Sequence, residues 1–527
     1  MAHSSNPLAG KSSIRVLFLR PPRHFWPILN ESDNFLLPLG YPALAAWLRR
    51  HMEGVEIEIL DCCATRTGWG SLRGLIENRR PDVLCVGEKT IYYKEGLKAF
   101  ELAKDIDPNI VTIGGGHMYS NLPEWSMTMC SALDYIGMFE GEITLTELLQ
   151  TLRDGGDLSQ VKGICYRDGD RFVQTPPRPT IEDLDDLPIP AYDVSSLELY
   201  SPFGNLWPRA ATIQRSRGCV DECSFCSWWV QEGSHEMIGG KLVHSKFYRS
   251  KSVERVIEEV ELLYEKHGIR YLFWVDATWN VDERWLAEFC EEIIRRDYKL
   301  GWWAFTRADG LVRQHEKGVL KLMARAGLRH VLLGAERSET TDFDYLKKTN
   351  YTHDIVKEAF HLLRDHHREV FRHGTFITGL RRDTAESIRA LLDYAHECDV
   401  DFAAFHPITP FPGTPMWSEA MDKGWIEEWD YENYDMFYPV MPTEHLSREE
   451  VSRHTQWCQQ NFVAKRPLRY FSRMLSPHPI RRRLHRWFTY AIGRVVLRDL
   501  ARSMRGQKKF EGFAAANKLW KPGWYNA

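Results

Sequence analysis

Three cysteines near the middle of the chain constrain its chemistry more than any other feature. Cys219, Cys223 and Cys226 follow one another with the spacing CxxxCxxC in the stretch RGCVDECSFC. Because thiolates bind iron-sulfur clusters and zinc readily, three of them in one loop can hold one metal centre. A closed cluster usually takes four cysteines, so three leave one iron open to a small molecule. The spacing therefore predicts a metal loop with a free coordination position.

A structural zinc site is the alternative, with His235 or His244 as its fourth ligand. Structural zinc sites usually pair their ligands across two separate turns. Here all three cysteines share a single loop, which follows a short strand-like run at residues 210–214. We therefore favour the cluster over the zinc site.

The motif, with the aromatic Phe225 before its last cysteine, resembles that of the radical S-adenosylmethionine (SAM) enzymes. In that family three cysteines hold a [4Fe-4S] cluster, which implies that Cys219, Cys223 and Cys226 hold one here. The resemblance also implies that SAM chelates the fourth iron through its amino and carboxylate groups. Reduction would then cleave SAM to a 5′-deoxyadenosyl radical, with Phe225 among the SAM-binding residues.

Residues 14–175 alternate apolar, strand-like runs with helical patterns. Helices are expected at 42–48 and 94–106, and strands are expected at 14–19, 55–60, 83–87 and 111–113. Strands that alternate with helices predict an α/β domain with a doubly wound, Rossmann-like sheet. A ligand of such a sheet lies at the carboxyl ends of its strands.

Glycines follow the predicted strands of this first region, where a missing Cβ lets a bulky ligand approach the backbone. Together with the segments Pro38–Tyr41 and Phe139–Glu142, they resemble the cobalamin-binding domain that precedes the cluster domain in B12-dependent radical SAM enzymes. The cobalamin-binding residues implied by this resemblance are Pro21, Gly40, Gly114, Gly115, Gly116, Glu140 and Gly141. A glycine turn that serves only packing is the alternative for residues 114–116.

The DxHxxG motif that supplies a lower axial histidine in the wider B12 family is absent, since the chain reads RPPRHFWP after its first strand. By resemblance to radical SAM relatives that also lack the motif, cobalamin is expected to bind without a histidine ligand. His24 and His117 are therefore expected to be loop or pocket residues.

Residues 176–204 are rich in proline and acidic side chains, which predicts a linker without regular structure. Residues 205–425 then contain six strand candidates that alternate with helical patterns, the number in the partial (β/α)6 barrel of the radical SAM family. The strands are expected at 210–214, 271–275, 302–305, 330–334, 375–377 and 402–405. Chemistry in α/β barrels takes place at the C-terminal ends of the strands.

Polar residues and a glycine follow successive strands of this predicted barrel. Asp276 lies where relatives hold the SAM amino group, and an ammonium group away from water needs such an anion. Arg307 can pair with a carboxylate through two hydrogen bonds. Glu336 resembles the ribose-contacting position of the family, and Gly379 lies in the stretch that packs on adenine. Each also fits a plain strand-end residue or helix cap, and no residue is assigned as a general acid or base.

Residues 426–527 are expected to form a helical, basic region. From Lys465 to Lys509 there are 14 Lys and Arg residues and one acidic residue, Asp499. A basic face of this kind can be solvated and inert, can lie on an anionic membrane surface, or can bind an anionic substrate. The layout from Tyr431 onward is loosely similar to that of the anaerobic magnesium-protoporphyrin monomethyl ester oxidative cyclase.

The whole chain has 527 residues and a net charge of −4, which gives no overall nucleic-acid signature. Its eleven cysteines lack paired spacing and it has no apolar leader, so we expect a cytoplasmic protein. No apolar run approaches the roughly 18 residues that a membrane span needs.

Three functions follow from these features. The first is a cobalamin-dependent radical SAM methyltransferase that acts on an unactivated carbon of a small molecule or natural-product intermediate, with a [4Fe-4S] cluster, SAM and cobalamin as cofactors. The second is a radical SAM oxidative cyclase with the same cofactors. The third is a non-catalytic zinc-binding protein. For the two enzymes, the expected partners are a small-molecule substrate and a reductant protein such as flavodoxin or ferredoxin.

Overall fold

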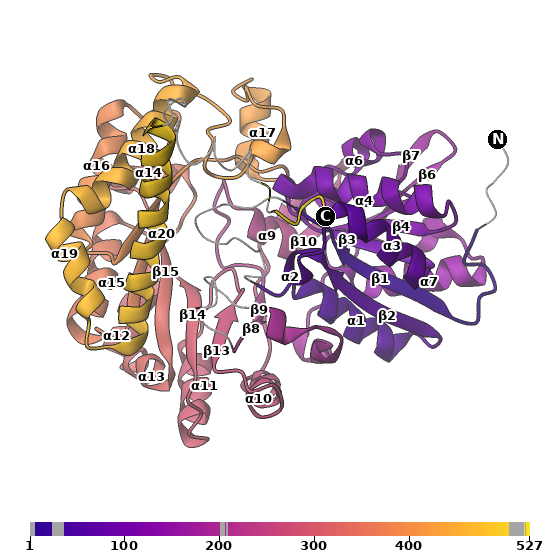
Figure 1. The fold of residues 1–527 in the computed structure, drawn as a ribbon, viewed down its shortest axis with the longest axis horizontal. Coiled ribbons are helices and arrows are strands. Elements are labelled where there is room, and N and C mark those ends of the chain that lie inside the picture. The colour runs from indigo at the N-terminus through magenta and orange to yellow at the C-terminus, as the bar shows by residue number, and fades with distance from the viewer. Residues whose placement is uncertain (1–5, 24–35, 201–205, 207–208, 505–520, 522) are drawn as a thin grey trace.

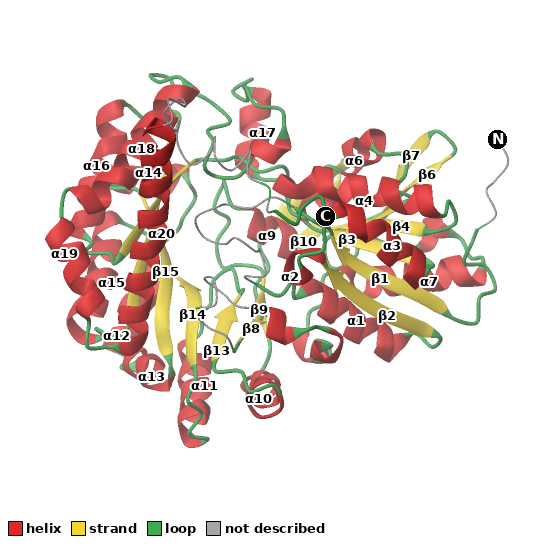
Figure 2. Ribbon diagram, viewed as in Figure 1, coloured by secondary structure: helices red, strands yellow, loops and turns green. Residues whose placement is uncertain are grey.

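The computed structural model describes residues 6–23, 36–200, 206, 209–504, 521 and 523–527. Two sheets organise these residues, and each is surrounded by helices (Figures 1 and 2). We call the seven-stranded sheet with its helices the first domain and the six-stranded sheet with its helices the second domain. His24 lies outside the described residues.

The first domain has the strand order β2-β1-β3-β4-β5-β6-β7. The strands from β2 to β5 in this order are parallel, and the pairs β5–β6 and β6–β7 are antiparallel. The strands are β1 (Ile14–Arg20), β2 (Val55–Asp61), β3 (Val83–Gly87), β4 (Val111–Gly115), β5 (Tyr135–Gly137), β6 (Ile164–Asp168) and β7 (Arg171–Gln174). The chain order reverses between β1 and β3, and a ligand crevice forms at such a switch point in doubly wound sheets.

Alternate side chains of the central strands bury both faces of this sheet. Val16 and Phe18 pack with α1 and α7 on one face, whereas Leu17 and Leu19 pack with α3 and α4 on the other. Two buried faces explain why these strands read as continuous apolar runs. The helices are α1 (Gly40–His51), α2 (Cys62–Thr65), α3 (Trp69–Arg79), α4 (Tyr93–Ile106), α5 (His117–Asn121), α6 (Pro123–Met129) and α7 (Gly141–Asp154), with the 3-10 helices η1 (Thr90–Tyr92) and η2 (Leu158–Gln160).

The second domain has six parallel strands in the order β17-β16-β15-β14-β13-β8. β8 and β17 form the two edges, so the sheet is open, as expected for a partial barrel. The strands are β8 (Ala210–Ile213), β13 (Tyr271–Trp274), β14 (Gly301–Thr306), β15 (Leu328–Glu336), β16 (Phe371–Thr378) and β17 (Phe402–Pro407). The six predicted strands are confirmed.

The two faces of the second sheet carry different helices. Leu272, Trp302 and Val331 pack against the helices that connect the strands. These connecting helices are α10 (Val253–Glu261), η6 (Leu262–Lys266, a π-helix), α11 (Glu283–Arg295), α12 (Ala308–Glu316), α13 (Val319–Ala326), α14 (Thr340–Tyr345), α15 (His353–His366) and α16 (Ala385–Glu397). The sheet is therefore covered along its outer face by its own crossovers.

The opposite face of this sheet receives the long helix α20 (Pro479–Met504), which crosses β15 in Figure 1. Phe273 and Phe371 of the strands pack with Leu484 and Phe488 of α20. The predicted helical C-terminal region therefore fills part of the concave side of the sheet. Its other described elements are η7 (Tyr431–Asn433), α18 (Arg448–Ala464), α19 (Pro467–Ser472) and η8 (Arg473–Leu475), and α17 (Pro415–Asp422) precedes the region.

Short elements precede and follow the loop that carries the three cysteines. They are β9 (Ser216–Arg217), α9 (Ser227–Glu232), β10 (Ser234–Ile238), β11 (Lys241–Ser245) and β12 (Arg249–Ser250). β10 and β11 form a hairpin, and β9 pairs with β12. Gly218 at the start of the loop has a φ of 78°, and a Cβ there would lie 1.9 Å from the Phe247 carbonyl oxygen, so only glycine fits.

The described part of the expected linker forms only three 3-10 helices, η3 (Leu184–Asp186), η4 (Tyr192–Val194) and η5 (Leu197–Leu199). It is nevertheless packed against both domains. The Tyr192 hydroxyl donates to Glu259 of α10 at 2.7 Å, and the Tyr200 hydroxyl donates to Asp61 at the end of β2 at 2.8 Å. Residues 201–204 lie outside the described part.

The last described residues return to the first domain. The Trp69 N–H donates to the Tyr525 carbonyl at 2.9 Å, and the Ser71 N–H donates to Ala527 at 3.0 Å, at the start of α3. Within the described ranges, no helix is both long and apolar enough to span a bilayer.

Candidate active site

The three-cysteine loop lies at the carboxyl end of β8, in contact with loops that follow other strands of the second domain. The Ser224 N–H donates to the Leu346 carbonyl at 2.9 Å, and the Met416 N–H donates to the Ser224 carbonyl at 2.9 Å. Cys223 is buried, whereas Cys219 and Cys226 are half-buried. The loop is thus fixed from two sides.

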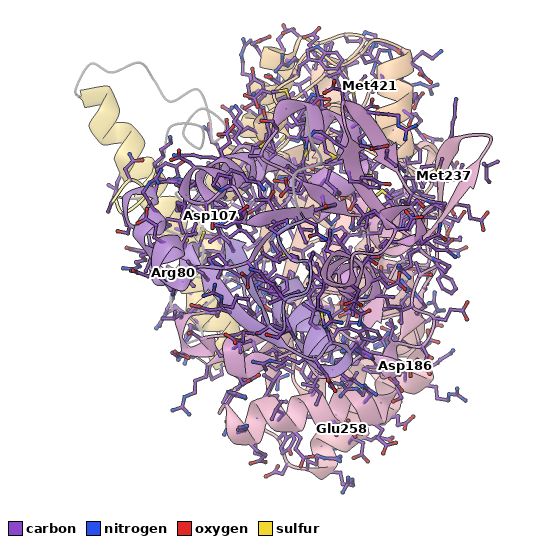
Figure 3. All side chains as sticks on the ribbon, turned by 90° about the vertical axis from the view of Figure 1, so that its right-hand side faces the viewer. Arg80, Asp107, Asp186, Met237, Glu258 and Met421 are labelled. Carbon is purple, nitrogen blue, oxygen red and sulfur yellow. The ribbon has the colours of Figure 1, made fainter. Side chains whose placement is uncertain are left out.

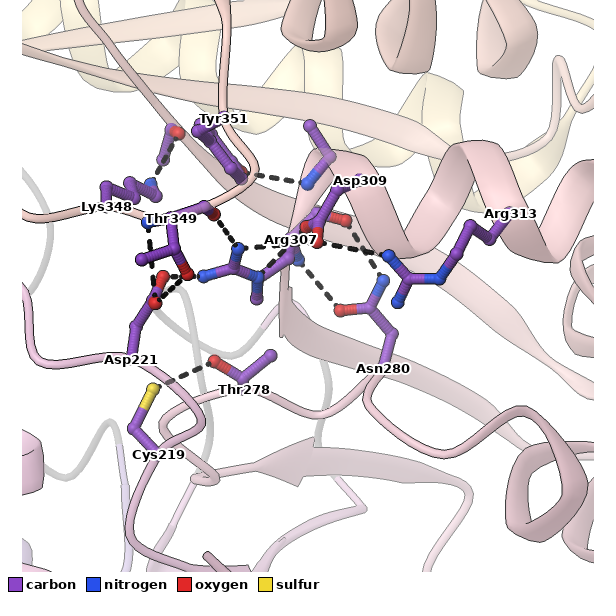
Figure 4. A network of polar contacts seen from close by, with 12 residues as sticks. Cys219, Asp221, Thr278, Asn280, Arg307, Asp309, Arg313, Lys348, Thr349 and Tyr351 are labelled. Carbon is purple, nitrogen blue, oxygen red and sulfur yellow. Dashed lines mark hydrogen bonds and ion pairs between the residues drawn. The ribbon is translucent and has the colours of Figure 1, made fainter. Parts of the chain in front are cut away.

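Hydrogen-bond donors surround the thiols. The Cys219 Sγ lies 3.6 Å from the Thr278 hydroxyl (Figure 4). Burial raises the pKa of the Cys226 thiol to about 12, a shift that is opposed by backbone N–H groups of Trp228 and Trp229. Burial also raises the pKa of Cys223 well above its usual value. Thiols of this kind lose their protons when a metal binds, and donors near the sulfurs suit a cluster.

The cysteine loop supplies the thiols that a cluster needs. Among the residues that the structure describes, no three His, Cys, Asp or Glu side chains converge as the ligands of one metal ion would. A cube-type cluster makes no such demand, because each cysteine binds a different iron. Three free thiols on one fixed loop are the donor set that this cluster requires.

The two candidate zinc histidines lie together on the β10–β11 hairpin. The Nδ1 atoms of His235 and His244 are 3.0 Å apart, and the His235 ring stacks on Phe139 with 3.5 Å between centroids. Burial lowers the pKa of His235 to about 3 and that of His244 to about 4. The two rings are therefore neutral and engaged with each other.

Arg307 fixes the cysteine loop from the end of β14. Its guanidinium forms an ion pair with Asp221 of the loop and another with Asp309, at 2.9 Å from Nε (Figure 4). It also donates to the Thr349 carbonyl at 2.7 Å, and the Thr349 hydroxyl donates to Asp221 at 2.5 Å. Arg307 is buried, so its charge is satisfied by these protein groups.

Glu336 and Lys348 form a second buried ion pair beside the loop. The Lys348 Nζ lies 2.7 Å from Glu336 Oε1 and donates to the Gly334 carbonyl at 2.9 Å. It also lies 4.0 Å from the ring centroid of Tyr351. Burial lowers the pKa of Lys348, but the Glu336 carboxylate outweighs burial and holds the pKa above its ordinary value. Lys348 is therefore a fixed positive charge near Cys223.

The other expected SAM-binding residues, Asp276, Gly379 and Phe225, lie in three different environments. Asp276 is fully buried after β13, and its Oδ1 accepts the Ser216 N–H at 2.6 Å and the Ser216 hydroxyl at 2.5 Å. Gly379 follows β16 with a φ of 75°, and a Cβ there would lie 2.9 Å from Val451 of α18. Phe225 is partly buried and packs against a hydrophobic cluster that contains residues of both domains.

At the carboxyl edge of the first sheet, the expected cobalamin-binding glycines divide into two groups. A Cβ at Gly40 would meet no atom within 4 Å, and one at Gly115 would meet only the Gly137 carbonyl at 3.7 Å. A Cβ at Gly114 would press on Tyr119, and one at Gly116 would lie 2.9 Å from the Glu88 carbonyl. The first pair leaves room for a large ligand, whereas the second pair is already needed for packing.

The remaining expected cobalamin-binding residues lie at the same edge. Pro21 follows β1, is buried, and its carbonyl accepts from the Cys63 thiol at 3.5 Å. Gly141 begins α7, where a Cβ would lie 3.1 Å from Leu44 of α1. His117 begins α5, and burial lowers its pKa to about 4. A neutral histidine there is consistent with a pocket residue.

Glu140 belongs to a buried ion cluster between the two domains. Arg217, two residues before Cys219, donates to Glu140 at 3.1 Å and to Glu142 at 2.5 Å. Arg249 on the neighbouring strand β12 donates to Glu140 at 3.0 Å. We call Glu140, Glu142, Arg217 and Arg249 the interdomain ion cluster. It ties the start of α7 to the strand that leads into the cysteine loop.

Burial makes this cluster sensitive to the loss of any member. Glu142 and Arg249 are 4% and 5% exposed. Burial raises the pKa of Glu142, but the Arg217 guanidinium outweighs it and the pKa lies below its ordinary value. Glu142 is therefore charged at neutral pH, and each of the two carboxylates has a positive partner.

Glu232, at the end of α9, lies against the same loop. Its Oε2 accepts the Gly218 N–H at 3.0 Å, and its Oε1 accepts from Gln214 Nε2 at 3.0 Å. Burial raises the pKa of Glu232 to about 7, because the hydrogen bonds and Arg217 only partly offset the cost of burying its charge. This carboxyl group therefore titrates near neutral pH.

We predict that Glu232→Gln flattens the pH dependence of stability near neutrality. In the folded state the pKa of Glu232 is about 7, above its ordinary value of 4.5, so between these two pH values the folded state binds more protons than the unfolded state. The protein therefore loses stability as the pH rises from 4.5 through about 7. A glutamine cannot titrate. Urea-unfolding midpoints from about pH 5 to pH 8 measure the effect, with the exposed Glu258→Gln as control. A slope equal to that of the wild type would contradict the prediction.

Sequence reasoning did not find several residues of this site. Thr278 and Lys348 lie beside the loop only because other strands bring them there, and no local pattern marks them. Asp221 lies within the loop, but its partner Arg307 comes from the end of β14. Arg217 and Glu142 are separated by 75 positions and pair across two domains. The two glutamates of Glu140-Gly141-Glu142 are a local sign of a charged contact. From the sequence alone, this segment is related only to cobalamin binding at the carboxyl edge of the first sheet.

Two family models match the chain. The radical SAM superfamily matches residues 213–395, and the B12 binding domain matches residues 26–149. The first match begins at the last residue of β8 and contains the cysteine loop, and the second contains the carboxyl ends of β3 and β4. The chain contains a B12-binding domain followed by a radical SAM domain. It is an enzyme whose cofactors are a [4Fe-4S] cluster, SAM and cobalamin.

Curated relatives of this B12-binding radical SAM protein cover most of its length. An uncharacterized methyltransferase of Pyrococcus horikoshii is 28% identical over 427 residues, 79% of this chain and 85% of the relative. The anaerobic magnesium-protoporphyrin IX monomethyl ester cyclase of Synechocystis is 26% identical over 534 residues, 96% of this chain and 97% of the relative. The expected similarity to both kinds of enzyme is confirmed.

The fold is shared with a solved structure. The radical SAM methyltransferase TsrM from Kitasatospora setae, solved with cobalamin and a [4Fe-4S] cluster, superposes with a TM-score of 0.60 at 20% identity. The match covers 78% of this chain and 75% of that one. This confirms the predicted order of a Rossmann-like domain followed by an open parallel barrel.

Proposed function

We propose that this enzyme is a cobalamin-dependent radical SAM methyltransferase that acts on an unactivated carbon of a small-molecule or natural-product intermediate. The observation that carries the proposal is the link between the cysteine loop and the B12-binding domain through Arg217. When bound, the cluster supplies the electron that cleaves SAM, and cobalamin carries the methyl group for transfer. The protein's own task is to hold these groups in register and to exclude water.

For the cluster, we assign Cys219, Cys223 and Cys226 as ligands. Asp221 and Arg307 would keep the loop in place, since Arg307 is already paired with protein carboxylates. This arrangement favours a positioning role for Arg307 over the SAM contact expected from the sequence.

For SAM, we keep Phe225, Asp276, Glu336 and Gly379 as contacts on the strand ends. Asp276 already accepts hydrogen bonds from Ser216, and Glu336 is paired with Lys348. Each carboxylate is therefore held rigidly, as a preorganised site requires.

For cobalamin, we assign the open positions Gly40 and Gly115 as the places of closest backbone approach, with Pro21 and Gly141 at the same edge. Gly114, Gly116 and Glu140 would support this edge from behind, through the packing and ion pairs described above. We keep the expectation that no histidine binds the cobalt.

A radical SAM oxidative cyclase is the second candidate. The observation that favours it is the match to the Synechocystis cyclase, which extends over nearly the whole of both chains, the basic C-terminal region included. The methyltransferase is preferred because a curated relative and a fold neighbour are both named methyltransferases.

The two candidates differ in their products, which an anaerobic assay distinguishes. Reconstituted protein is incubated with SAM, cobalamin, a reductant and a pool of candidate metabolites, and mass spectrometry follows the products. A methyltransferase should release S-adenosylhomocysteine together with 5′-deoxyadenosine and a product heavier by one methylene. Release of 5′-deoxyadenosine alone, with a product that has lost hydrogen, would instead support the cyclase.

The partners we propose are a small-molecule substrate and a one-electron donor protein such as flavodoxin or ferredoxin, in the cytoplasm. The donor is required because cleavage of SAM consumes an electron. The basic C-terminal region suggests in addition a peripheral contact with a membrane.

A further inference from the structure

An exposed apolar turn projects from the second domain, on the side opposite to the first domain (Figure 1). Leu468, Phe471 and Leu475 lie on α19 and η8 and are 86%, 44% and 77% exposed. Their spacing of three and four residues places them on one side of the helical turn. We call these three residues the apolar tip. Large apolar side chains exposed together mark an interaction site more often than isolated ones do.

Basic side chains surround the apolar tip. Arg482 donates to the Ser476 carbonyl at 2.8 Å, and Arg486 donates to the Met474 carbonyl at 3.3 Å, so both arginines of α20 flank Leu475. On the other side, Lys465 and Arg466 precede α19 and are exposed. The chain has no Asp or Glu from residue 451 to residue 498.

Acidic groups of neighbouring helices offset only part of this charge. Asp399 is buried and pairs with Arg469 at 2.7 Å, and Asp393 of α16 pairs with Lys465 at 3.3 Å. Glu397 faces Lys357 instead. Arg482 and Arg486 donate hydrogen bonds to backbone carbonyls, so their charges leave a positive rim next to the apolar tip.

We infer that the apolar tip is a docking site for a membrane surface rich in anionic lipids. A convex apolar turn can enter the region between headgroups and acyl chains, while the basic rim pairs with lipid phosphates. The charge of the rim favours an anionic partner, and the convex shape of the tip lets its three apolar side chains enter a lipid surface without a preformed groove. The contact is peripheral, and it is independent of the reaction proposed above.

Vesicle co-sedimentation of the full-length protein tests the inference. The wild type should sediment with vesicles of phosphatidylcholine and phosphatidylglycerol in equal parts, and much less with phosphatidylcholine alone. Added salt should weaken the binding, because it screens the charges. The triple variant Leu468→Ser, Phe471→Ser and Leu475→Ser should bind at least about tenfold more weakly, since each substitution removes apolar surface. Arg486→Gln should weaken binding about fivefold.

A matched control uses another exposed apolar group, on the β10–β11 hairpin. Met237, Ile238 and Val243 are 45%, 57% and 39% exposed, and Met237 lies at the edge of the molecule in Figure 3. Replacing these three by serine should leave vesicle binding unchanged. Circular dichroism and cobalamin binding, measured for both triple variants, check that the chain still folds.

Four results would overturn the inference. They are a wild type that does not sediment with anionic vesicles, equal binding to both vesicle types, equal binding by the apolar-tip variant, and equal losses in the two triple variants. Size-exclusion chromatography of the same proteins tests the main alternative, in which the apolar tip joins two copies of the chain. A dimer that is lost in the apolar-tip variant, without lipid binding by the wild type, would assign the tip to contact between two copies of the chain.

Discussion

Cys223→Ser should remove the [4Fe-4S] cluster and reductive cleavage of SAM from this enzyme. Cys223 is the most buried of the three loop cysteines, and serine cannot replace a thiolate that is fixed at this depth. Changes to outer partners of a metal already cost about 10–100-fold, so we expect the loss of a ligand to lower 5′-deoxyadenosine formation by more than about a hundredfold. Iron and sulfide analysis, with electron paramagnetic resonance of the reduced protein, gives a readout that does not depend on turnover.

The control for this variant is Cys165→Ser. Cys165 is also buried, but it lies on β6 of the first domain, away from the loop. It should keep about four irons and SAM cleavage. If Cys223→Ser retained full iron content and cleaved SAM at the rate of the wild type, the assignment of the loop as a cluster site would be wrong.

Arg217→Met should destabilise the protein by roughly 3–5 kcal/mol, because it leaves the buried Glu142 carboxylate without its main partner, whereas Glu140 keeps Arg249. The first transition in urea, followed by circular dichroism, measures the loss, since a two-domain chain need not unfold in one step. Adding Glu142→Gln to this variant should restore part of the stability by removing one uncompensated charge. The exposed ion pair between Arg171 and Asp168 provides the control. Arg171→Met should lower the stability by about 0.5 kcal/mol or less.

The pH dependence of Arg217→Met follows from the same ion pairs. In the wild type, Arg217 holds the pKa of Glu142 below its ordinary value of 4.5. The stability from this pair is present above that value and is lost as the pH falls through the lowered pKa. The difference between wild type and variant should therefore shrink in acid. A difference that stays constant from neutral pH to acid would show that the ion pair is not its source.

The strands of both sheets could be predicted because their side chains are apolar on both faces. β1, β3 and the six strands of the second domain are short apolar runs that end at glycine, proline or polar residues. β5 was missed because it has only three residues, and the β10–β11 hairpin was missed because its outer positions are a mixture of polar and apolar side chains. The position of α20 on the concave face of the sheet depends on tertiary packing, which no periodicity reveals.

The candidate site could be predicted only in part, because several of its contacts also depend on tertiary packing. The spacing of three cysteines is local, so sequence alone identified the loop. Arg307 and Glu336 were expected to contact SAM, and no local pattern indicated that they pair with Asp221 and Lys348. The segment LKKTN around Lys348 reads as an exposed turn, yet the fold buries its lysine beside Glu336. Ion pairs between residues on distant strands cannot be predicted before the arrangement of the strands is known.

The interdomain ion cluster has a consequence for recombination between related genes. A chimaera that takes its first half from one relative and its second half from another would separate Glu140 and Glu142 from the arginines that match them. Such hybrids should fold poorly unless the relative that supplies the first half has the same two glutamates, or unless the segment with both arginines comes from the same relative as the glutamates. The two halves of this enzyme are thus expected to be inherited as a unit.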